Sequence, residues 1–294
     1  MARGNRTASI FRALRPHQWA KNLLLFVPAL LAHNWSIAVW SNAMVAFIAM
    51  CACSSRAYVI NDIVDLEADK LHAYKSKRPF AAGELSRVTG IVIAVLLLFC
   101  ALALILRLEP LACVLLLTYI VTTVAYSLWL KTLMAVDLLV LASLYCLRVL
   151  LGGAATSIAI SPWTVTFSMF LFFSLALMKR YAELYNLRAK EETRSPRRGY
   201  SVEDMPAISS LGSASAMTAV MVIALYVNGL DVRGLYTRPN LLFMMCVVVL
   251  LWLTRLWLLT HRGQMHEDPV LYAIRDRWSL ILGGLAIAVI LAAL

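Results

Sequence analysis

The segment from residue 42 to 69, NAMVAFIAMCACSSRAYVINDIVDLEAD, joins a long apolar run to a cluster of acidic side chains. The run from 42 to 60 is long enough, at about 1.5 Å per helical residue, to cross a hydrocarbon layer of about 30 Å. Asn61 then begins a polar stretch with four carboxylates before residue 70. The sequence therefore predicts a membrane-spanning helix that ends in a charged segment at the membrane surface.

The rest of the chain is equally apolar. Hydrophobic residues make up 62% of its 294 residues, charged residues make up 15%, and mean hydropathy is +0.78, whereas soluble domains are nearer half apolar and a quarter charged. No Pro/Gly/Ser-rich linker divides the sequence, so we expect one all-α membrane domain over residues 1–294. Runs long enough to span a bilayer number nine: 23 to 40, 42 to 60, 88 to 107, 110 to 130, 133 to 151, 162 to 180, 208 to 228, 240 to 260 and 278 to 294.

Lysine and arginine are distributed unevenly between the two sides of these runs. With the N-terminus in the cytoplasm, the inner segments hold 21 of these residues and the outer segments hold three: Arg107, Arg233 and Arg238. The positive-inside rule then predicts a multi-pass protein of the inner or plasma membrane whose C-terminus is outside. The long loops, about 61 to 87 and 181 to 207, should face the cytoplasm. This asymmetry explains most of the net charge of +11, so we expect no nucleic-acid partner.

The acidic segment has a helical pattern. On a continuous helix Asp62, Asp65 and Asp69 fall within about 60° of one another, Asn61 lies at the edge of their face, and Glu67 points the opposite way. Converging carboxylates repel each other, and Mg²⁺ removes that cost while taking only one or two protein carboxylates, with phosphate oxygens and water completing its octahedron. We predict a magnesium-diphosphate site on this face, with nearby phosphate ligands from Lys75, Lys77 and Arg78.

These motifs resemble a known family. NDIVDLEAD followed by KSKRPFAAGELS resembles the first aspartate-rich motif of the UbiA superfamily of intramembrane prenyltransferases, and RPHQWAKN (15 to 22), YSLWLK (126 to 131) and LRVLLGG (147 to 153) are also similar to it. The resemblance implies a UbiA-like bundle of nine transmembrane helices with cytoplasmic cap loops around a cytoplasm-facing site. Within these stretches, further candidates for substrate binding are Gln18, Lys21, Asn22, Tyr126 and Lys131.

The second long loop departs from the usual UbiA pattern. Members typically carry a second motif, D-x-x-x-D, at the inner end of the sixth span, but this chain reads MKRYAEL (178 to 184). On a helix Lys179, Glu183, Asn186 and Lys190 form one stripe, with Arg180 beside it. KRYAEL resembles the corresponding stretch of decaprenyl-phosphate phosphoribosyltransferases, a UbiA branch, as do PRRGYSVEDM (196 to 205) and EDPVLYAIRDRWS (267 to 279).

The resemblance implies transfer of ribose 5-phosphate from phosphoribosyl diphosphate to a polyprenyl phosphate, as a precursor for arabinose-containing cell-surface glycans. The donor carries a diphosphate at C1 and a phosphate at C5, so an acidic face can hold the magnesium diphosphate while Lys179 and Arg180 bind the second phosphate. Glu183 would bond ribose hydroxyls or orient Lys179, and it joins the three aspartates as a predicted catalytic residue. Asp137, just inside the fifth span, is expected to meet substrate hydroxyls, and Arg148 to serve a structural or lipid-head role near the outer side.

Two other functions are consistent with parts of the sequence. A UbiA-type prenyltransferase would move a prenyl group from a prenyl diphosphate to an aromatic or other acceptor, but the missing second aspartate motif counts against it. A lipid-phosphate transporter would place charges near the middle of the membrane, whereas here they gather at the cytoplasmic ends of the helices. The sequence leaves open the polyprenyl chain length and whether the chain forms a homo-oligomer.

Overall fold

The computed structural model describes residues 6–71, 75–191, 193, 198–229, 232, 234–265 and 268–294. Every regular element in these ranges is a helix, so the all-α prediction is confirmed for them. The chain forms two compact units. The first unit is Met1–Leu128 with Leu147–Ala159, and the second unit is Trp129–Cys146 with Ile160–Leu294.

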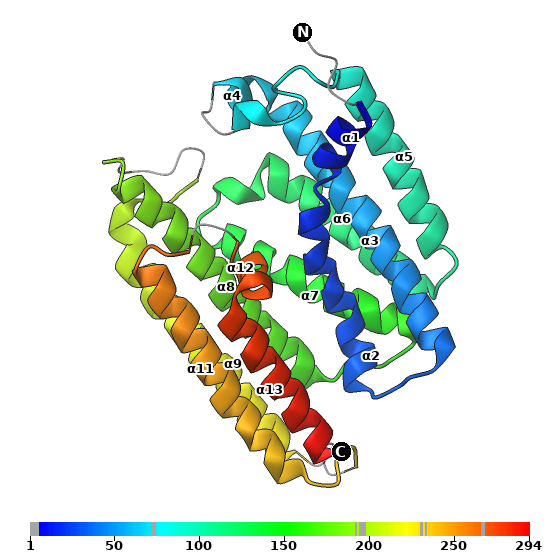
Figure 1. The fold of residues 1–294 in the computed structure, drawn as a ribbon, viewed down its shortest axis with the longest axis vertical. Coiled ribbons are helices and arrows are strands. Elements are labelled where there is room, and N and C mark those ends of the chain that lie inside the picture. Colours follow the sequence, from blue (N-terminus) through cyan, green and yellow to red (C-terminus); the bar gives the residue numbers. More distant parts are fainter. Residues whose placement is uncertain are drawn as a thin grey trace. The chain divides into compact units, whose positions relative to one another are not determined.

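The first unit is built around α3 (Ile37–Val64), which runs beside α5 (Arg87–Ile105), as Figure 1 shows. The end of α7 (Val136–Thr156) also belongs to it, and a Cβ at Gly152 would lie 2.1 Å from the carbonyl oxygen of Leu25, so only glycine allows this close approach. The other elements of the first unit are α1 (Arg6–Leu14), η1 (Pro16–Phe26), α2 (Val27–Leu31), α4 (Leu66–Lys70), η2 (Lys75–Lys77) and α6 (Pro110–Leu128).

The second unit is built around α8 (Pro162–Arg188), which packs along α9 (Met205–Asn228), and α11 (Phe243–His261) packs against α9 in turn (Figure 1). The helix α8 continues eight residues past the predicted end of the sixth span at residue 180, so the predicted stripe lies on this helix from Lys179 to Asn186. The unit also contains the start of α7, together with η3 (Leu130–Thr132), η4 (Val202–Asp204), η5 (Pro239–Leu242), α12 (Pro269–Arg275) and α13 (Arg277–Ala293).

Seven helices of the described residues are long and apolar enough to cross a membrane, and an eighth span results if α12 and α13, bent by 80°, count as one. The one predicted span outside this set is the first, 23 to 40, which overlaps η1 and α2. Eleven 3₁₀ residues at about 2.0 Å and five α-helical ones at about 1.5 Å rise about 30 Å, which equals the thickness of the hydrocarbon layer, so nine spans stay a prediction. The predicted break at residue 41 is wrong, because Ser36 caps α3 by accepting a hydrogen bond from the Val39 amide at 3.3 Å.

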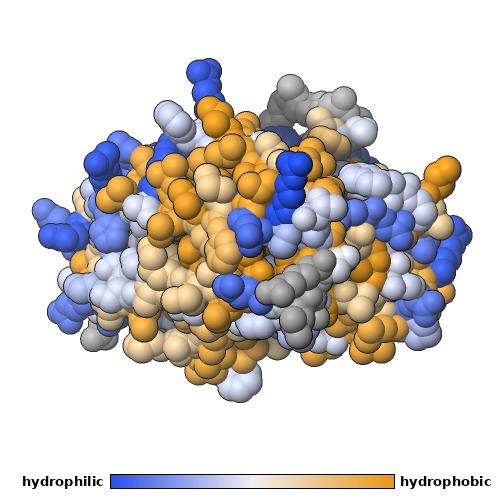
Figure 2. Space-filling view, turned by 90° about the horizontal axis from the view of Figure 1, so that it is seen from below, coloured by the Kyte–Doolittle hydropathy of each residue, from blue (hydrophilic) through white to orange (hydrophobic). Residues whose placement is uncertain are grey.

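Large apolar side chains cover much of the surface, as Figure 2 shows for one face. On α5, for example, Val88, Leu96 and Phe99 are all more than 60% exposed. Such a surface is stable against lipid rather than water, which supports a multi-pass membrane protein. Several residues behind the predicted orientation (Arg3, Arg194, Arg197 and Arg233) lie outside the described residues, and the orientation stays a prediction.

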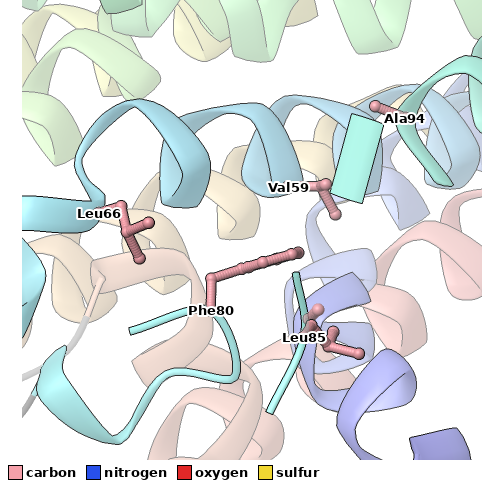
Figure 3. Packing of buried hydrophobic residues seen from close by; sticks show 6 residues of the cluster. Val59, Leu66, Phe80, Leu85 and Ala94 are labelled. Carbon is pink, nitrogen blue, oxygen red and sulfur yellow. The ribbon is translucent and has the colours of Figure 1, made fainter. Parts of the chain in front are cut away.

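A small apolar core fixes the loop after α4. Figure 3 shows the Phe80 ring extending towards Val59 of α3, with Leu66 of α4 and Leu85 of the loop beside it. Ala13 of α1 and Ala94 of α5 complete this cluster, which is almost wholly buried. Because the core holds both ends of the segment between α4 and α5, it also fixes the charged side chains that this segment carries.

Candidate active site

The predicted acidic face exists, although the helix that carries it is interrupted. The helix α3 ends at Val64 and α4 begins at Leu66, but Asp65 and Asp69 each donate an i to i−4 backbone hydrogen bond across the break, at 2.9 and 2.8 Å. The helical phase is therefore kept. Asp62 and Asp69 are both 2% exposed, and both accept from Arg78 Nη1, at 3.1 Å through Asp62 Oδ1 and at 2.6 Å through Asp69 Oδ2.

A second arginine, which the sequence did not single out, reaches the same carboxylate. Arg15 Nη2 donates to Asp62 Oδ1 at 2.5 Å, and its guanidinium lies over the Tyr58 ring at 5.0 Å from the centroid. Arg15 follows α1 in a left-handed conformation, with φ 51°. Helical phasing cannot foresee a contact made from such a residue, although the arginine directly before a proline in RPHQWAKN was a visible signal.

The acidic face has a place for a cation. The Asp62 Oδ2 atom is buried and has no hydrogen-bond partner among the described residues, which is costly for a carboxylate oxygen unless a cation binds there. The described residues contain no group of three or more His, Cys, Asp or Glu side chains placed to hold a metal. Because Mg²⁺ commonly uses only one or two protein carboxylates and takes its other ligands from phosphate and water, Asp62 and Asp69 fit such an ion.

The other predicted residues of this loop are placed differently. Glu67 is 69% exposed and pairs with Lys70 and Arg87, and the hydrogen bond from Lys70 lowers the pKa of its carboxyl. Lys75 and Lys77 are exposed on η2. Asn61 and Asp65 are half-buried.

The residues of the RPHQWAKN motif divide into two groups. Gln18 accepts a hydrogen bond from the Tyr58 hydroxyl at 3.4 Å, close to Arg15. Lys21 and Asn22 are buried on η1. The Asn22 amide nitrogen donates to Cys51 Sγ and Ser54 Oγ, both at 3.3 Å.

Arg148 completes this buried polar network. It is 6% exposed and donates to Asn22 Oδ1 at 3.1 Å and to the Tyr119 hydroxyl at 2.9 Å. It thus lies level with Ser54 on α3, eight residues or about 12 Å along the helix from Asp62. A structural role fits this placement, whereas a lipid-head role requires an exposed guanidinium.

In the second unit, Asp137 and Arg180 form a buried ion pair, with exposed fractions of 0% and 1%. Arg180 also pairs with Glu183 one turn along α8, and Arg198 donates to the same Glu183 oxygen at 3.0 Å. The Tyr200 hydroxyl donates to Asp137 Oδ1 at 2.6 Å. The predicted trio of Asp137, Arg180 and Glu183 therefore does come together, joined by two residues of PRRGYSVEDM.

Tyr200 is held as a hydrogen-bond donor. Burial raises the pKa of its hydroxyl, and the hydrogen bond to Asp137 raises that pKa further, so the hydroxyl stays protonated at neutral pH. The Tyr200 oxygen also accepts from the backbone amide of Ala135 at 2.8 Å. This residue therefore ties the loop after α8 to the segment that leads into α7.

Lys179 has a partner that the sequence analysis did not choose. Its ammonium donates to Asp268 Oδ2 at 3.4 Å, and Asp268 Oδ1 accepts from the Tyr145 hydroxyl at 3.2 Å and from the Val270 amide that begins α12. Lys179 keeps 34% of its side chain exposed. Asp268 lies in the EDPVLYAIRDRWS stretch, so the signal was present, but its contact with α8 is not visible from sequence spacing.

The remaining candidates are surface groups. Asn186 and Lys190 are exposed on the last turns of α8 and beyond, and Lys131 is half-buried in η3. Tyr126 is half-buried near the end of α6, in the first unit. The assignments of Lys131 and Tyr126 to substrate binding stay predictions.

Comparison with known proteins shows which family and which individual proteins this sequence is similar to. The sequence profile of the UbiA prenyltransferase family matches residues 22–292. The uncharacterized protein y4nM of Sinorhizobium fredii is 36% identical over 92% of this chain, which spans only about half, 53%, of that protein. The nodulation protein NoeC of Azorhizobium caulinodans is 33% identical over 95% of this chain and 91% of its own length. The decaprenyl-phosphate phosphoribosyltransferase of Mycobacterium tuberculosis is 33% identical over 62% of each chain.

Solved structures agree on the fold. A UbiA homolog from Archaeoglobus fulgidus bound to GPP and Mg²⁺ superposes with a TM-score of 0.72 over 97% of this chain and 99% of its own, at 15% identity. A UbiA homolog from Aeropyrum pernix without ligand gives 0.65 over 93% and 98%, at 19% identity. At these identities the likeness establishes the architecture, and the chemistry has to be argued from the residues.

Proposed function

We propose that this chain, which belongs to the UbiA prenyltransferase family, transfers 5-phosphoribose from phosphoribosyl diphosphate to a polyprenyl phosphate. The products would be polyprenyl-phosphoryl-5-phosphoribose and diphosphate. The proposal rests on the residue types near the end of α8. Where UbiA prenyltransferases typically have a second pair of aspartates, this chain has Lys179, Arg180 and Glu183. The relatives named decaprenyl-phosphate phosphoribosyltransferases support the same donor and acceptor.

The acidic face would bind the diphosphate end of the donor. Asp62, Asp65 and Asp69, with Asn61, would hold magnesium, which supplies positive charge to the leaving diphosphate. Arg78, with 28% of its side chain exposed, can turn from the two aspartates towards a diphosphate oxygen. Its planar guanidinium suits phosphate because it can donate two parallel hydrogen bonds.

The second unit would bind the ribose and its 5-phosphate. Lys179 is the best placed cation for the phosphate, since a third of its side chain is exposed and its ion pair with Asp268, at 3.4 Å, is long. Arg180 is buried and committed to Asp137 and Glu183, so we assign it to holding Glu183. One Glu183 oxygen takes both arginines, which leaves the other oxygen to accept ribose hydroxyls.

The reaction then needs no general base. A phosphate monoester has a second pKa near 6 and is mostly dianionic at neutral pH, so an acceptor oxygen can attack C1 directly. The new bond joins that oxygen to C1, the bond from C1 to the diphosphate oxygen breaks, and no proton has to move. The protein contributes positioning and charge stabilisation, and the product would serve arabinose-containing cell-surface glycans.

A second candidate reaction is prenyl transfer from a prenyl diphosphate to another acceptor. It is favoured by the family and by the superposition on a homolog bound to GPP and Mg²⁺. Such a donor has no second phosphate for Lys179 to bind.

One assay separates the two reactions. Purified full-length protein in detergent is given Mg²⁺, phosphoribosyl diphosphate labelled in the ribose, and a polyprenyl phosphate, and lipid-extractable label is measured. We expect transfer by the wild type, none after chelation of Mg²⁺, and none by Asp65→Ala. Glu67→Gln is the matched control, because it removes a carboxylate that is exposed and paired elsewhere. No label in the lipid fraction, with prenyl diphosphate consumed in a parallel reaction, would refute the proposal.

A further inference from the structure

We infer that Arg15 is a positioning residue of the acidic face, which fixes the Asp62 carboxylate so that its Oδ2 atom remains available to the metal. The inference rests on the part of the proposed function that places a magnesium diphosphate at Asp62, and it is independent of which group is transferred. Arg15 would touch neither substrate nor reacting atoms. Its effect on them would pass through Asp62.

The backbone at Arg15 is unusual in a way that demands support. A left-handed conformation, here φ 51° and ψ 61°, is rare for a residue with a side chain, and a following proline disfavours helical conformations further. Such strain persists only where the surrounding structure over-determines it, and it gathers at functional sites. The elbow between α1 and η1 at Arg15 therefore needs a local restraint.

Ser55 supplies that restraint from both sides of the elbow. Its hydroxyl donates to the Leu14 carbonyl oxygen at 2.8 Å and accepts from the Trp19 indole nitrogen at 2.9 Å. Ser55 is 1% exposed and lies on α3 seven residues, or about two turns, before Asp62. Two side chains of α3 therefore act together: Ser55 fixes the elbow, and Asp62 accepts a hydrogen bond from Arg15 at the elbow.

The geometry at Asp62 shows what the arginine does. Both Arg15 and Arg78 donate to the same oxygen, Oδ1, while the buried Oδ2 has no hydrogen-bond partner among the described residues. Arg15 is held in turn against the Tyr58 ring, a cation–π contact that restricts its guanidinium. Without Arg15, the carboxylate can rotate and accept from the Arg78 fork with both oxygens, which would close Oδ2 to a metal ion.

The test measures metal binding without any turnover. Full-length protein in detergent is titrated with Mg²⁺ at a fixed concentration of inorganic diphosphate, and the half-saturating Mg²⁺ concentration is read from the rise in thermal unfolding midpoint. We expect Arg15→Gln to raise that concentration about tenfold, the lower end of what removing a residue that orients a metal ligand typically costs. Ser55→Ala should raise it by a smaller factor in the same direction. Arg15→Lys should fall between Arg15→Gln and the wild type, because a lysine keeps the charge.

Two controls separate positioning from general effects. Arg12→Gln removes an equal charge three residues earlier, on α1, but Arg12 pairs with Glu84, so its half-saturation should match the wild type. The double variant Arg15→Gln with Ser55→Ala should equal Arg15→Gln alone, because Ser55 acts through Arg15. An unchanged Mg²⁺ dependence in Arg15→Gln or in Ser55→Ala, an equal change in Arg12→Gln, or additive effects in the double variant would each overturn the inference. Because no ribosyl donor is present, these results stand apart from the transfer assay.

Discussion

Each unit of the protein gathers two arginines and two carboxylates, but the two clusters differ in which side chains are buried. In the first unit the acids are buried and the arginines are partly exposed: Asp62 is 2% exposed, whereas Arg15 and Arg78 are 21% and 28% exposed. In the second unit a complete ion pair of Asp137 and Arg180 is buried, with exposed fractions of 0% and 1%. Glu183, which pairs with Arg180, and Arg198, which pairs with Glu183, are more exposed, at 34% and 25%.

The two clusters also differ in which kind of buried atom lacks a hydrogen bond. Among the described residues, the buried atom without a hydrogen bond is an acceptor in the first cluster, Asp62 Oδ2, and a donor in the second, Arg180 Nε. The first cluster therefore has unmet capacity for a cation. In the second cluster, among the described residues, each carboxylate is paired with an arginine and no buried carboxylate oxygen lacks a hydrogen bond. At the position where UbiA members typically carry a second aspartate motif, this chain has Arg180, which pairs with both Asp137 and Glu183.

The largest expected effect tests whether the buried ion pair of Asp137 and Arg180 stabilises the fold. Asp137→Asn keeps the shape of the side chain and an acceptor for Tyr200, but it leaves Arg180 buried beside only the half-buried Glu183. Removing one partner of a buried pair costs about 3–5 kcal/mol, and we expect a loss of this size in the free energy of unfolding, measured by titration with SDS in mixed micelles. Asp62→Asn should cost only about 1 kcal/mol, because its arginines can turn to water.

A compensating variant sharpens this result. Asp137→Leu combined with Arg180→Met replaces the pair by apolar side chains, and such exchanges are often neutral for stability. The double variant should therefore regain most of the unfolding free energy while transfer stays impaired, because Glu183 has lost the buried one of the two arginines that hold it. Full recovery of transfer would mean that Arg180 has no part in placing Glu183.

Helical periodicity predicted the first cluster better than the second. Asp62 and Asp69 share a face as predicted, because the i to i−4 hydrogen bonds continue through the break at Asp65, and local geometry alone fixes that relation. Contacts made across long separations were out of reach: Arg15 is 47 residues from Asp62, Tyr200 is 63 from Asp137, and Lys179 is 89 from Asp268. Such pairs depend on how the helices pack, which a single sequence does not encode in its spacing.

The fold was predictable for the same reason. Apolar length alone found the spans that became long helices, since crossing about 30 Å of hydrocarbon requires a run of about 20 residues. It placed the first boundary wrongly because the turn at Asn34 to Ser36 is short and lies between two apolar stretches. Length also gave no sign that η1 would be a 3₁₀ helix, a form in which runs longer than about four residues are uncommon.

The second largest expected effect tests whether the first cluster serves catalysis rather than stability. Asp69→Asn should lower transfer on the order of 100-fold, which is typical for loss of one group that stabilises developing charge. Its free energy of unfolding should change by less than about 1 kcal/mol, because Arg78 remains partly exposed and can turn to water. Initial rates in the lipid-extraction assay, alongside the same SDS titration, provide both numbers. A stability loss as large as that of Asp137→Asn would remove the distinction between the clusters.

A smaller effect is expected at Lys179. Lys179→Ala should raise the KM for phosphoribosyl diphosphate about tenfold, the size of one charge-assisted hydrogen bond, and leave the apparent affinity for the polyprenyl phosphate unchanged. Glu67→Ala, on the exposed side of α4, should leave both constants unchanged. Adding Asp268→Asn to Lys179→Ala should raise the KM no further, because Asp268 acts through the lysine. Equal effects of Lys179→Ala and Glu67→Ala would refute the assignment of the donor phosphate to the second unit.

The smallest effect concerns the edge of the first cluster, where Glu84 fastens α1 to the loop that carries Arg78. Glu84 accepts from Ser9 Oγ at 2.6 Å and pairs with Arg12, and the hydrogen bond from Ser9, followed by that from Arg12, lowers the pKa of its carboxyl. A carboxyl whose pKa is lower in the folded state stabilises that state above its unfolded pKa of about 4.3. This contribution is lost as the pH falls through the lower, folded pKa. For a partly exposed pair it should amount to no more than about 1 kcal/mol.

Thermal unfolding midpoints of the wild type and Glu84→Gln, measured from pH 7 to pH 3, isolate the contribution of the Glu84 charge to stability, because every other titrating group is common to both proteins. The wild type should have the higher midpoint at pH 7, and the difference should shrink below about pH 4.3 as Glu84 takes up its proton. A difference that stays constant over this range would mean that the charge of Glu84 is irrelevant to the docking of α1. The hydrogen bond from Ser9, which the glutamine of Glu84→Gln could also accept, and the apolar contacts of Ala13 would then account for the docking of α1 on this loop.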